Sequence, residues 1–515
     1  MLDNIEAAAL EKVLFQDVTK RFPGVLANDR VTLQIRRGEV LGLVGENGAG
    51  KTTLMNILYG LYQPDEGQIY VDGLPVEIRS PSDAIDHGIG MVHQHFMLVR
   101  PFTVTENLVL GLRDGRGPFL DLKQAQRKVE DLAAGLGIQV DPQARIWQLS
   151  VGEQQRVEIL NALLRHVDLL ILDEPTAVLT PQETEALFTI LRRLTGQGKS
   201  VVFITHKLQE AIAATDRISV LRHGVVVDTV PTVEVSERQL ASMMVGREVL
   251  FSYERKPGNG SGELLSVQDL KVRGDRNLLA VDGVNLTVKS GEILGIAGVD
   301  GNGQTELCEA LAGMRPIEAG TVKINGRPFE RLDPLTVAAQ GVGYIPADRH
   351  HTALVLDMPV WANAVLKRFG ENQFCRNLLL RRKSIHAFSS KLIEEYDIRV
   401  SGPKVMARGM SGGNQQKLVL ARELSTDPEV LIADQPTRGL DVGAIEYVHE
   451  RLLEQRARGK GVLLVSRELE EIFSLSDRIA VMYEGRIVEV VSSENADREL
   501  IGELMAGVTH LAGND

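Results

Sequence analysis

The chain has 515 residues, with 57 Lys and Arg against 69 Asp and Glu, which gives a formal net charge of −12 at pH 7. This length suits about two to four folded domains, and 43% hydrophobic with 24% charged residues is typical of globular proteins. The acidic total disfavours a nucleic-acid backbone as the main partner, and two cysteines are too few for a disulfide framework. The N-terminus lacks the order of a signal peptide, and no apolar run approaches the ~18 residues of a membrane span, so we expect a chain that stays inside the cell.

The first motif is a glycine-rich loop between a predicted strand and a predicted helix. Residues 40–44 (VLGLV) are typical of a buried strand, and they lead directly into GENGAGKT, which fits the phosphate-loop pattern G-x-x-x-x-G-K-[ST]. Glycines let backbone amides turn around phosphate oxygens, while Lys51 would reach the β- and γ-phosphates and Thr52 would ligate Mg²⁺. The expected nucleotide-binding residues are Gly45, Glu46, Asn47, Gly48, Ala49, Gly50, Lys51, Thr52 and Thr53.

A predicted helical insertion, residues 96–148, precedes the next motif. Residues 149–156 (LSVGEQQR) place a serine and a glycine at the start of a predicted helix. This arrangement can bind an anion, and it is equally typical of an ordinary helix N-cap. The residues alone leave both interpretations open.

Residues 169–174 (LLILDE) form a predicted strand that ends in two carboxylates. Asp173 can hold Mg²⁺, and Glu174 can polarise an attacking water, although a solvated strand end is the alternative for this segment alone. His206 ends another predicted strand, SVVFITH, where it could contact a γ-phosphate. Two further positions have weak signals by themselves: Gln94 and Phe22.

The chain repeats itself at a period near 255 residues. GEVLGLVG at 38–45 returns as GEILGIAG at 291–298, an offset of 253, and LSVGEQQR returns as MSGGNQQK at 410–417, an offset of 261. LILDEPTAVLT returns as LIADQPTRGLD at 431–441, again at 261. Such a period is too long for a solenoid repeat, so it indicates a duplicated domain.

The repeat and the composition of its seam divide the chain into two domains and a linker. Strand-like runs alternate with helical stretches in each copy, which predicts an α/β fold with a largely parallel sheet. A second helical insertion is expected at 350–409. The stretch ERKPGNGSG is rich in Gly, Pro and charge. We therefore expect a first domain at 11–250, a linker at 251–262 and a second domain at 263–510.

In their order, these motifs resemble the ATP-binding subunit of ABC transporters, and the resemblance covers nearly the whole chain twice. It implies two tandem P-loop domains, each with a parallel core sheet, an antiparallel N-terminal β part and a helical subdomain, and it implies ATP and Mg²⁺ as cofactors. It makes Phe22 an adenine-stacking aromatic, Gly45–Thr52 a Walker A loop and Gln94 a Q-loop glutamine. It makes Ser150–Gln154 a signature, Asp173 with Glu174 a Walker B pair, and His206 a switch histidine. The implied catalytic residues are Glu174, His206 and Gln94, and the implied Mg²⁺ ligands are Thr52, Gln94 and Asp173.

The second copy lacks several of these groups. Its counterpart of Lys51 is Gln304, and its counterpart of Gln94 is Ala347. Glu174 is replaced by Gln435, and His206 by Ser466. Thr305 and Asp434 remain, so nucleotide binding can persist. The signatures differ in the opposite sense, because Ser411-Gly412-Gly413 is intact whereas the first copy has Ser150-Val151-Gly152.

In the family that the chain resembles, two domains meet head to tail, and each site uses one copy's phosphate loop and the other copy's signature. The resemblance thus implies one complete and one degenerate site. The complete site would combine Lys51, Thr52, Gln94, Asp173, Glu174 and His206 with Ser411, Gly412, Gly413, Asn414 and the Asp441 loop. The degenerate site would combine Gln304, Thr305 and Gln435 with Ser150, Val151 and Gly152.

The fused arrangement and the second signature are similar to those of the sugar and nucleoside importer branch. Residues 91–99, 298–307 and 433–444 look most like its nucleoside (simple-sugar) subgroup. The implied function is ATP hydrolysis that powers uptake through two separate membrane permeases, at the cytoplasmic face of the membrane, with cargo delivered by an extracytoplasmic binding protein. Two alternatives are a duplicated ABC protein acting on ribosomes or nucleic acid, which the acidic total and short linker disfavour, and a non-hydrolysing nucleotide-gated scaffold.

Overall fold

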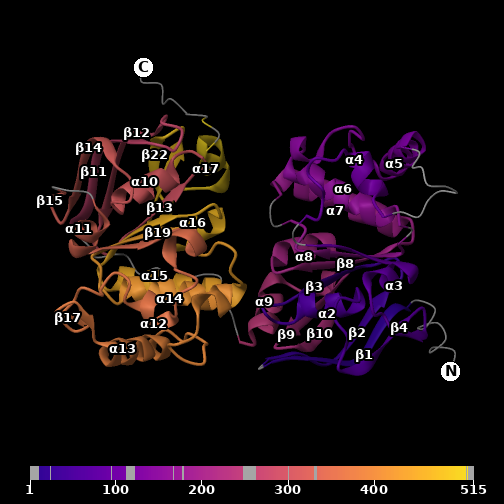
Figure 1. Cartoon of the computed structure of the whole chain (residues 1–515). Coiled ribbons are helices and arrows are strands. Elements are labelled where there is room, and N and C mark those ends of the chain that lie inside the picture. The colour runs from indigo at the N-terminus through magenta and orange to yellow at the C-terminus, as the bar shows by residue number, and fades with distance from the viewer. Residues whose placement is uncertain are drawn as a thin grey trace, which may run out of the picture. The chain divides into compact units, whose positions relative to one another are not determined.

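The chain forms two units in a computed structural model, Met1–Val249 and Leu250–Asp515 (Figure 1). The expected linker, 251–262, lies outside the described residues except for Gly262. The structure describes residues 11–23, 25–93, 96–111, 122–165, 167–176, 179–247, 262–299, 301–329, 333–505 and 507.

The first unit opens with an antiparallel sheet in the order β2-β1-β4-β5. Val13 and Phe15 of β1 are fully buried and pack with Leu41 and Leu43 of the main sheet in one apolar core. The antiparallel sheet therefore supports the central strand that leads into the phosphate loop. Its strands are β1 (Glu11–Phe22), β2 (Val25–Arg36), β4 (Glu66–Val71) and β5 (Leu74–Val76).

The main sheet of the first unit has the order β10-β9-β3-β8-β7-β6. β6, β7, β8, β3 and β9 are parallel, and β10 joins antiparallel. β3, β7 and β8 are buried along their whole length, which explains their continuous apolar sequences. The strands are β3 (Val40–Val44), β6 (Ile89–Val92), β7 (Leu169–Asp173), β8 (Ser200–Thr205), β9 (Arg217–Arg222) and β10 (Val225–Pro231); the helices around them are α2 (Lys51–Leu58), α3 (Pro81–Asp86), α7 (Pro181–Gly196), α8 (Leu208–Ala214), η2 (Thr232–Glu234) and α9 (Glu237–Val245).

A helical subdomain is inserted between β6 and β7, as the sequence predicts. One apolar core joins its helices to the main sheet: Val129 of α5 and Leu160 of α6 lie in the same cluster as Phe203 of β8. Thr103 caps α4 with a reciprocal bond to Glu106, which fixes where that helix starts. The elements are α4 (Val104–Val109), α5 (Leu122–Leu136), η1 (Ile146–Gln148) and α6 (Val151–Leu163).

The second unit has the same architecture. Its antiparallel sheet has the order β12-β11-β14-β15, and its main sheet, β16-β19-β20-β13-β21-β22, repeats the first unit's order when read from the other edge. The strands are β11 (Glu263–Arg273), β12 (Leu279–Lys289), β13 (Ile293–Ala297), β14 (Ile317–Ile324), β15 (Arg327–Pro328), β16 (Val342–Ile345), β19 (Val430–Asp434), β20 (Gly461–Val465), β21 (Arg478–Tyr483) and β22 (Arg486–Ser492); the helices are α10 (Gln304–Leu311), α11 (Pro334–Ala339), α15 (Val442–Ala457), α16 (Leu469–Leu475) and α17 (Arg498–Met505).

The helical subdomain of the second unit also contains a β-hairpin. The two short strands of this hairpin pair antiparallel just before α13. The elements are η3 (Arg349–Ala353), α12 (Val360–Ala364), β17 (Cys375–Arg376), β18 (Leu379–Leu380), α13 (Arg382–Glu395), η4 (Ala407–Gly409) and α14 (Gly412–Leu424). The predicted fold class is confirmed in both units. Within the described ranges, no helix is long and apolar enough to cross a bilayer.

Candidate nucleotide site

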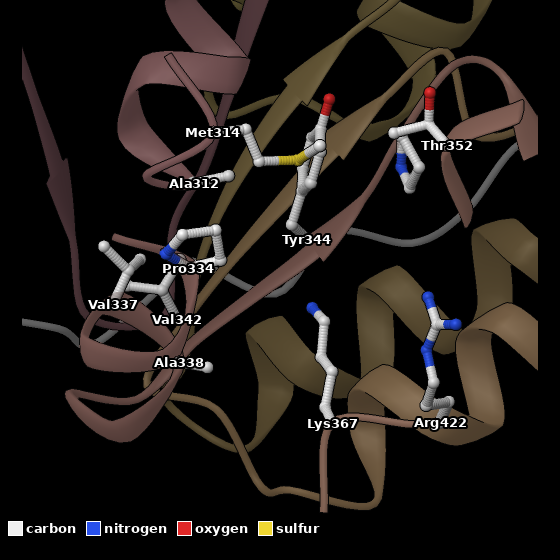
Figure 2. Close-up of a pocket in the computed structure, with 11 residues that line it drawn as sticks. Ala312, Met314, Pro334, Val337, Ala338, Val342, Tyr344, Thr352, Lys367 and Arg422 are labelled. Atoms are coloured by element: carbon white, nitrogen blue, oxygen red, sulfur yellow. The ribbon is translucent and has the colours of Figure 1, made fainter. Parts of the chain in front are cut away.

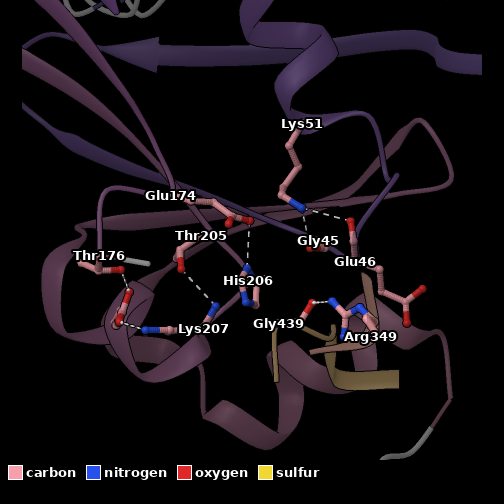
Figure 3. A network of polar contacts seen from close by, with 11 residues as sticks. Gly45, Glu46, Lys51, Glu174, Thr176, Thr205, His206, Lys207, Arg349 and Gly439 are labelled. Carbon is pink, nitrogen blue, oxygen red and sulfur yellow. Dashed lines mark hydrogen bonds and ion pairs between the residues drawn. The ribbon is translucent and has the colours of Figure 1, made fainter. Parts of the chain in front are cut away.

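Three parallel strands bring the predicted residues of the first copy to one edge of the sheet. β3 pairs with β8, and β8 pairs with β7 so that Asp173 lies opposite Ile204. The carboxyl ends of parallel strands share one edge, where α/β proteins bind ligands. Figure 3 shows Lys51, Glu174 and His206 at this edge.

The phosphate loop has a backbone that only glycine adopts easily. Gly48 and Gly50 have φ values of +83° and +103°, in the left-handed region. A Cβ on Gly45 would collide with the carbonyl oxygen of Leu221, and one on Gly50 with that of Ala27. The glycines are therefore required both by the turn and by the close approach of neighbouring backbone.

The side chain of Lys51 follows the inside of this loop. It is 5% exposed, and its Nζ donates to the carbonyl oxygens of Gly45 at 2.7 Å and Glu46 at 3.0 Å (Figure 3). These bonds hold a buried positive charge at the start of α2, where the helix end also attracts anions. The position suits an ammonium group that binds terminal phosphates.

Asp173 and Thr52 are close enough to share a metal ion. The Thr52 hydroxyl hydrogen-bonds the Asp173 carboxylate, which is 4% exposed. Burial raises the Asp173 pKa above its ordinary value, against the opposing effects of Thr52 and Lys51. A carboxylate and a hydroxyl are hard oxygen ligands of the kind Mg²⁺ takes beside nucleotide phosphates, and a cation would offset the cost of burying this charge.

Glu174 follows directly and is oriented by His206. His206 Nδ1 lies 2.9 Å from Glu174 Oε1, and Glu174 has a φ of +48°, unusual for a residue with a side chain (Figure 3). The hydrogen bond from His206 lowers the Glu174 pKa below its ordinary value and outweighs the opposing effect of burial. The carboxylate is thus kept ionised, as a group that polarises water must be.

Removing His206 should move the acid limb of the activity profile to higher pH. His206→Ala deletes the largest effect that lowers the Glu174 pKa and leaves burial, so the pKa rises and the carboxylate is protonated at a higher pH. The measurement is kcat/KM against pH. The matched control is Lys207→Ala, because Lys207 has the weakest of the effects that lower the Glu174 pKa. If His206→Ala did not shift the acid limb, the role of His206 would be contradicted.

The other predicted residues of the first copy are less constrained by the structure. Phe22 is the last residue of β1 and lies outside the apolar core. The centroid of its ring is 5.3 Å from the centroid of the Tyr62 ring and 5.6 Å from Lys20 Nζ. Its adenine-stacking role stays a prediction. Gln94 lies outside the described residues.

The structure shows the N-cap that the sequence allowed at the first signature. Ser150 accepts a hydrogen bond from the Glu153 amide at 3.2 Å, and the Ser150 amide donates to the Glu153 carboxylate at 2.7 Å. Val151 follows with its side chain 41% exposed. A bulky side chain therefore stands at the helix start where the second copy has glycine.

The second signature has the same kind of serine cap without the reciprocal bond, since Ser411 Oγ accepts from the Asn414 amide at 3.5 Å. Ser411 Oγ accepts from Asn414 Nδ2 at 2.9 Å, and Asn414 Oδ1 accepts from the Arg399 amide at 2.7 Å. No side chain projects from Gly412 or Gly413. The second copy therefore lacks the bulky side chain that Val151 adds at this helix start in the first copy.

The phosphate loop of the second copy keeps its shape but not its charge. Gly301 and Gly303 have φ values of +85° and +99°, close to their first-copy counterparts. Gln304 is 8% exposed, and its Nε2 donates to the Val299 carbonyl at 3.0 Å, at the position corresponding to Glu46. The amide of Gln304 therefore replaces a loop-closing bond of Lys51 without its positive charge.

A polar cavity of about 180 Å³ lies in front of this loop. The position of the missing glutamate is filled by Gln435, with a φ of +45°, and that of the histidine by Ser466. Asp434 is fully buried behind them. The residues that line the cavity are Gly298, Gly301, Gln304, Thr305, Glu306, Gln435, Val465, Ser466 and Arg467.

Comparisons with known proteins agree with this geometry. The family model described as "ABC transporter" matches residues 28–177 and 281–438. The chain belongs to the ABC transporter family. It is a duplicated ATP-binding subunit of that family, and it binds and hydrolyses ATP.

Curated relatives extend the similarity over nearly the whole chain. The Glucose import ATP-binding protein TsgD13 of Haloferax volcanii is 48% identical over 96% of this chain and 95% of its own length. The Nucleoside import ATP-binding protein NupA of Lactococcus lactis is 48% identical over 95% and 97%, and the Guanosine import ATP-binding protein NupO of Bacillus subtilis 48% over 96% and 97%. Among solved structures, "RNase-L Inhibitor" has a TM-score of 0.59 at 21% identity, over 96% of this chain and 93% of its own, which shows the fold alone.

One arginine beside this ABC transporter subunit's second signature was missed by sequence reasoning. Arg349 donates to the carbonyl oxygens of Arg438 at 2.8 Å and Gly439 at 3.4 Å, and its Nη2 lies 3.3 Å from the position a Cβ would take on Gly412. It therefore holds the loop before Asp441 and lies beside the signature; Figure 3 shows its bond to Gly439. The only signal in the sequence was its place two residues after Ala347.

A second cavity of the second unit, about 70 Å³, lies between the main sheet and the helical subdomain (Figure 2). Tyr344 and Met314 line one side, and Lys367 and Arg422 the other. Both basic groups are bound to the buried Glu423, at 2.6 and 2.9 Å. They outweigh the effect of burial and hold the Glu423 pKa below its ordinary value. The basic groups here therefore have a structural partner.

Proposed function

We propose that this chain powers the import of a nucleoside, or of a closely related simple sugar, through separate membrane permeases. The observation that carries the proposal is the full-length similarity of 48% to nucleoside, guanosine and glucose import proteins, together with Lys51, Glu174 and His206 at one edge of the first copy's sheet. Ribose import proteins are more distant, at 39 to 40%. The proposed cargo is therefore a nucleoside or a simple sugar, and two of the three relatives at 48% identity are named for nucleosides.

In the proposed mechanism, the first copy's own side chains divide the work of hydrolysis. Lys51 binds the terminal phosphates, and Glu174, held by His206, orients and polarises the attacking water. Thr52 and Asp173 would hold Mg²⁺, which neutralises charge on the phosphates when bound. The phosphate-binding groups then hold ATP and ADP with different strength. This difference can drive a conformational change of the protein.

We further propose that the two copies are functionally unequal. Gln304 and Gln435 remove the cation and the base from the second copy's loop, while its signature, Ser411–Gly413, keeps both glycines. By the resemblance, that signature would serve the first copy's ATP. One complete and one degenerate site are therefore expected per chain.

Restoring the missing carboxylate should not restore the second site. Gln435→Glu adds a base, but Gln304 still lacks the charge that binds phosphates, so the steady-state rate of phosphate release should change by less than about twofold. The matched variant is Glu174→Gln in the first copy. A several-fold gain of activity in Gln435→Glu would show that the second site is limited by its base alone.

The proposed partners are two permease subunits, and the proposed location is the cytoplasmic face of the cell membrane. In the second unit, the cavity of Figure 2 lies beside the residues that follow β16, at the junction with the helical subdomain. This junction corresponds to the surface that the resemblance assigns to permease docking. An extracytoplasmic binding protein would deliver the cargo.

Transport by the assembled system tests the proposal. The chain is reconstituted in proteoliposomes with membrane proteins from the genes adjacent to its own that are tested as its permeases. Uptake of labelled guanosine and glucose is measured with ATP supplied on the side of the chain. We expect ATP-dependent guanosine uptake that unlabelled nucleosides inhibit more strongly than glucose does. Uptake of neither compound, with intact ATPase activity and co-sedimentation with ribosomes, would favour the ribosomal alternative.

A further inference from the structure

The β17–β18 hairpin of the second helical subdomain presents apolar side chains to solvent. Leu378, Leu379 and Leu380 are 96%, 74% and 49% exposed. In Figure 1, β17 lies at the outer edge of its unit, close to α13. Three consecutive exposed leucines at a hairpin tip form an apolar surface that folding of the subdomain does not explain.

The turn holds one of these leucines in an unfavourable backbone conformation. Asn377 and Leu378 have φ values of +50° and +64°, as a two-residue hairpin turn of this hand requires. Asparagine tolerates this region, and the second position normally has glycine, whereas leucine is disfavoured there. A strained, fully exposed leucine is more typical of a contact residue than of a turn residue.

A separate small core holds the hairpin in place. Phe374 and Ile385 are 1% and 0% exposed and pack with Val365. The guanidinium of Arg368 lies over the rings of Phe374 and Phe388, at 5.6 and 5.1 Å. The leucines at the tip are therefore not needed to close this core.

The hairpin is surrounded by basic side chains in an otherwise acidic chain. Residues 366–393 contain seven Lys and Arg and one acidic residue, Glu371, which is already paired with Arg368 at 2.6 Å. The exposed residues that flank the leucines are Arg376, Arg381, Arg382 and Lys383. Within the part of the chain that the structure describes, no carboxylate forms a salt bridge with any of these four.

We propose that the β17–β18 hairpin binds the surface of an anionic phospholipid membrane. The leucines would enter the boundary between headgroups and acyl chains, while the four basic residues contact lipid phosphates. Charge complementarity favours this partner, because the leucines are apolar and the four exposed charges that flank them in sequence are all positive. The inference goes beyond the proposed function, in which permeases alone hold the chain at the membrane.

Vesicle binding by the full chain, without permeases, tests this inference. Co-sedimentation is compared for vesicles of pure phosphatidylcholine and for vesicles with about 30% phosphatidylglycerol, at low and moderate salt. We expect binding to the anionic vesicles that weakens with salt. Leu378→Ser should lower the partition coefficient about fivefold to tenfold, and Arg382→Glu at least about fivefold.

Matched variants on the same unit control for exposure and charge. Leu335→Ser removes a leucine that is 69% exposed on α11, and Arg327→Glu reverses an exposed charge on β15. Neither should change vesicle binding. ATPase activity in solution should be unchanged in all four variants, so a failure of vesicle binding is distinguishable from a failure of the proposed function.

Two outcomes would overturn the inference. One is equal or absent binding to both kinds of vesicle. The other is vesicle binding that Leu378→Ser leaves intact while the same change weakens association with the purified permeases, since the hairpin would then bind protein rather than lipid.

Discussion

Glu174→Gln should reduce the steady-state rate of ATP hydrolysis by about 10² to 10⁴-fold while leaving ATP binding in place. The amide keeps the shape of the side chain but cannot act as a base toward water, and it loses the charge that His206 stabilises at 2.9 Å. The protein itself shows that the fold tolerates this change. Gln435 occupies the corresponding position in the second unit with a φ of +45°, against +48° for Glu174.

The measurement is phosphate release under multiple turnover, with ATP affinity determined in parallel. Glu185→Gln, at an exposed position on α7, is the control for loss of one carboxylate. Hydrolysis in Glu174→Gln within a fewfold of the unmodified chain would remove this residue from the catalytic role. Complete loss of ATP binding would instead indicate that the loop after β7 had been disturbed.

Lys51→Gln should weaken ATP binding by about tenfold to a hundredfold and lower hydrolysis further, because a charged hydrogen bond to phosphate contributes roughly 1.5–3 kcal/mol. Glutamine is the informative substitution here. In the second copy, Gln304 closes the same kind of loop through a 3.0 Å bond to the Val299 carbonyl. The change therefore removes the charge and keeps a loop-closing bond, whereas Lys51→Ala would remove both.

Titration of a fluorescent ATP analogue gives the affinity, and thermal unfolding without nucleotide checks the fold. Gln304→Lys is the reciprocal variant, and it should strengthen binding at the second loop if charge is what that loop lacks. Equal ATP affinity in Lys51→Gln and the unmodified chain would contradict the assignment. So would a loss of affinity matched by a large fall in Tm, since the loop would then have been unfolded.

Much of the fold was predictable because its signals are local. The strand 40–44 is apolar throughout since it is buried on both faces, and the loop after it needs glycines at positions with positive φ. The duplication added information, because each motif could be compared with its copy at an offset of 253 or 261 residues. The helical insertions were visible as stretches without strand-like runs.

Several features of the site could not be predicted because they join residues distant in sequence. The contact of Arg349 with the carbonyl of Gly439 spans 90 positions, and no local pattern indicates it. The bond from Gln304 to Val299 is local, but a glutamine in this motif indicates only a missing charge. The shape of this phosphate loop depends on packing, because the backbone of Met482 lies close against Gly298.

The sequence by itself determined the two copies, the residues each retains and the chemistry they can perform, because these depend on residue identity and spacing. Only the tertiary structure decided which side chains are exposed or oriented. Leu378 and Phe374 are both apolar and four residues apart, yet one is 96% exposed and the other 1%. Their environments follow from the register of a hairpin and from the core beneath it, which are properties of the folded chain.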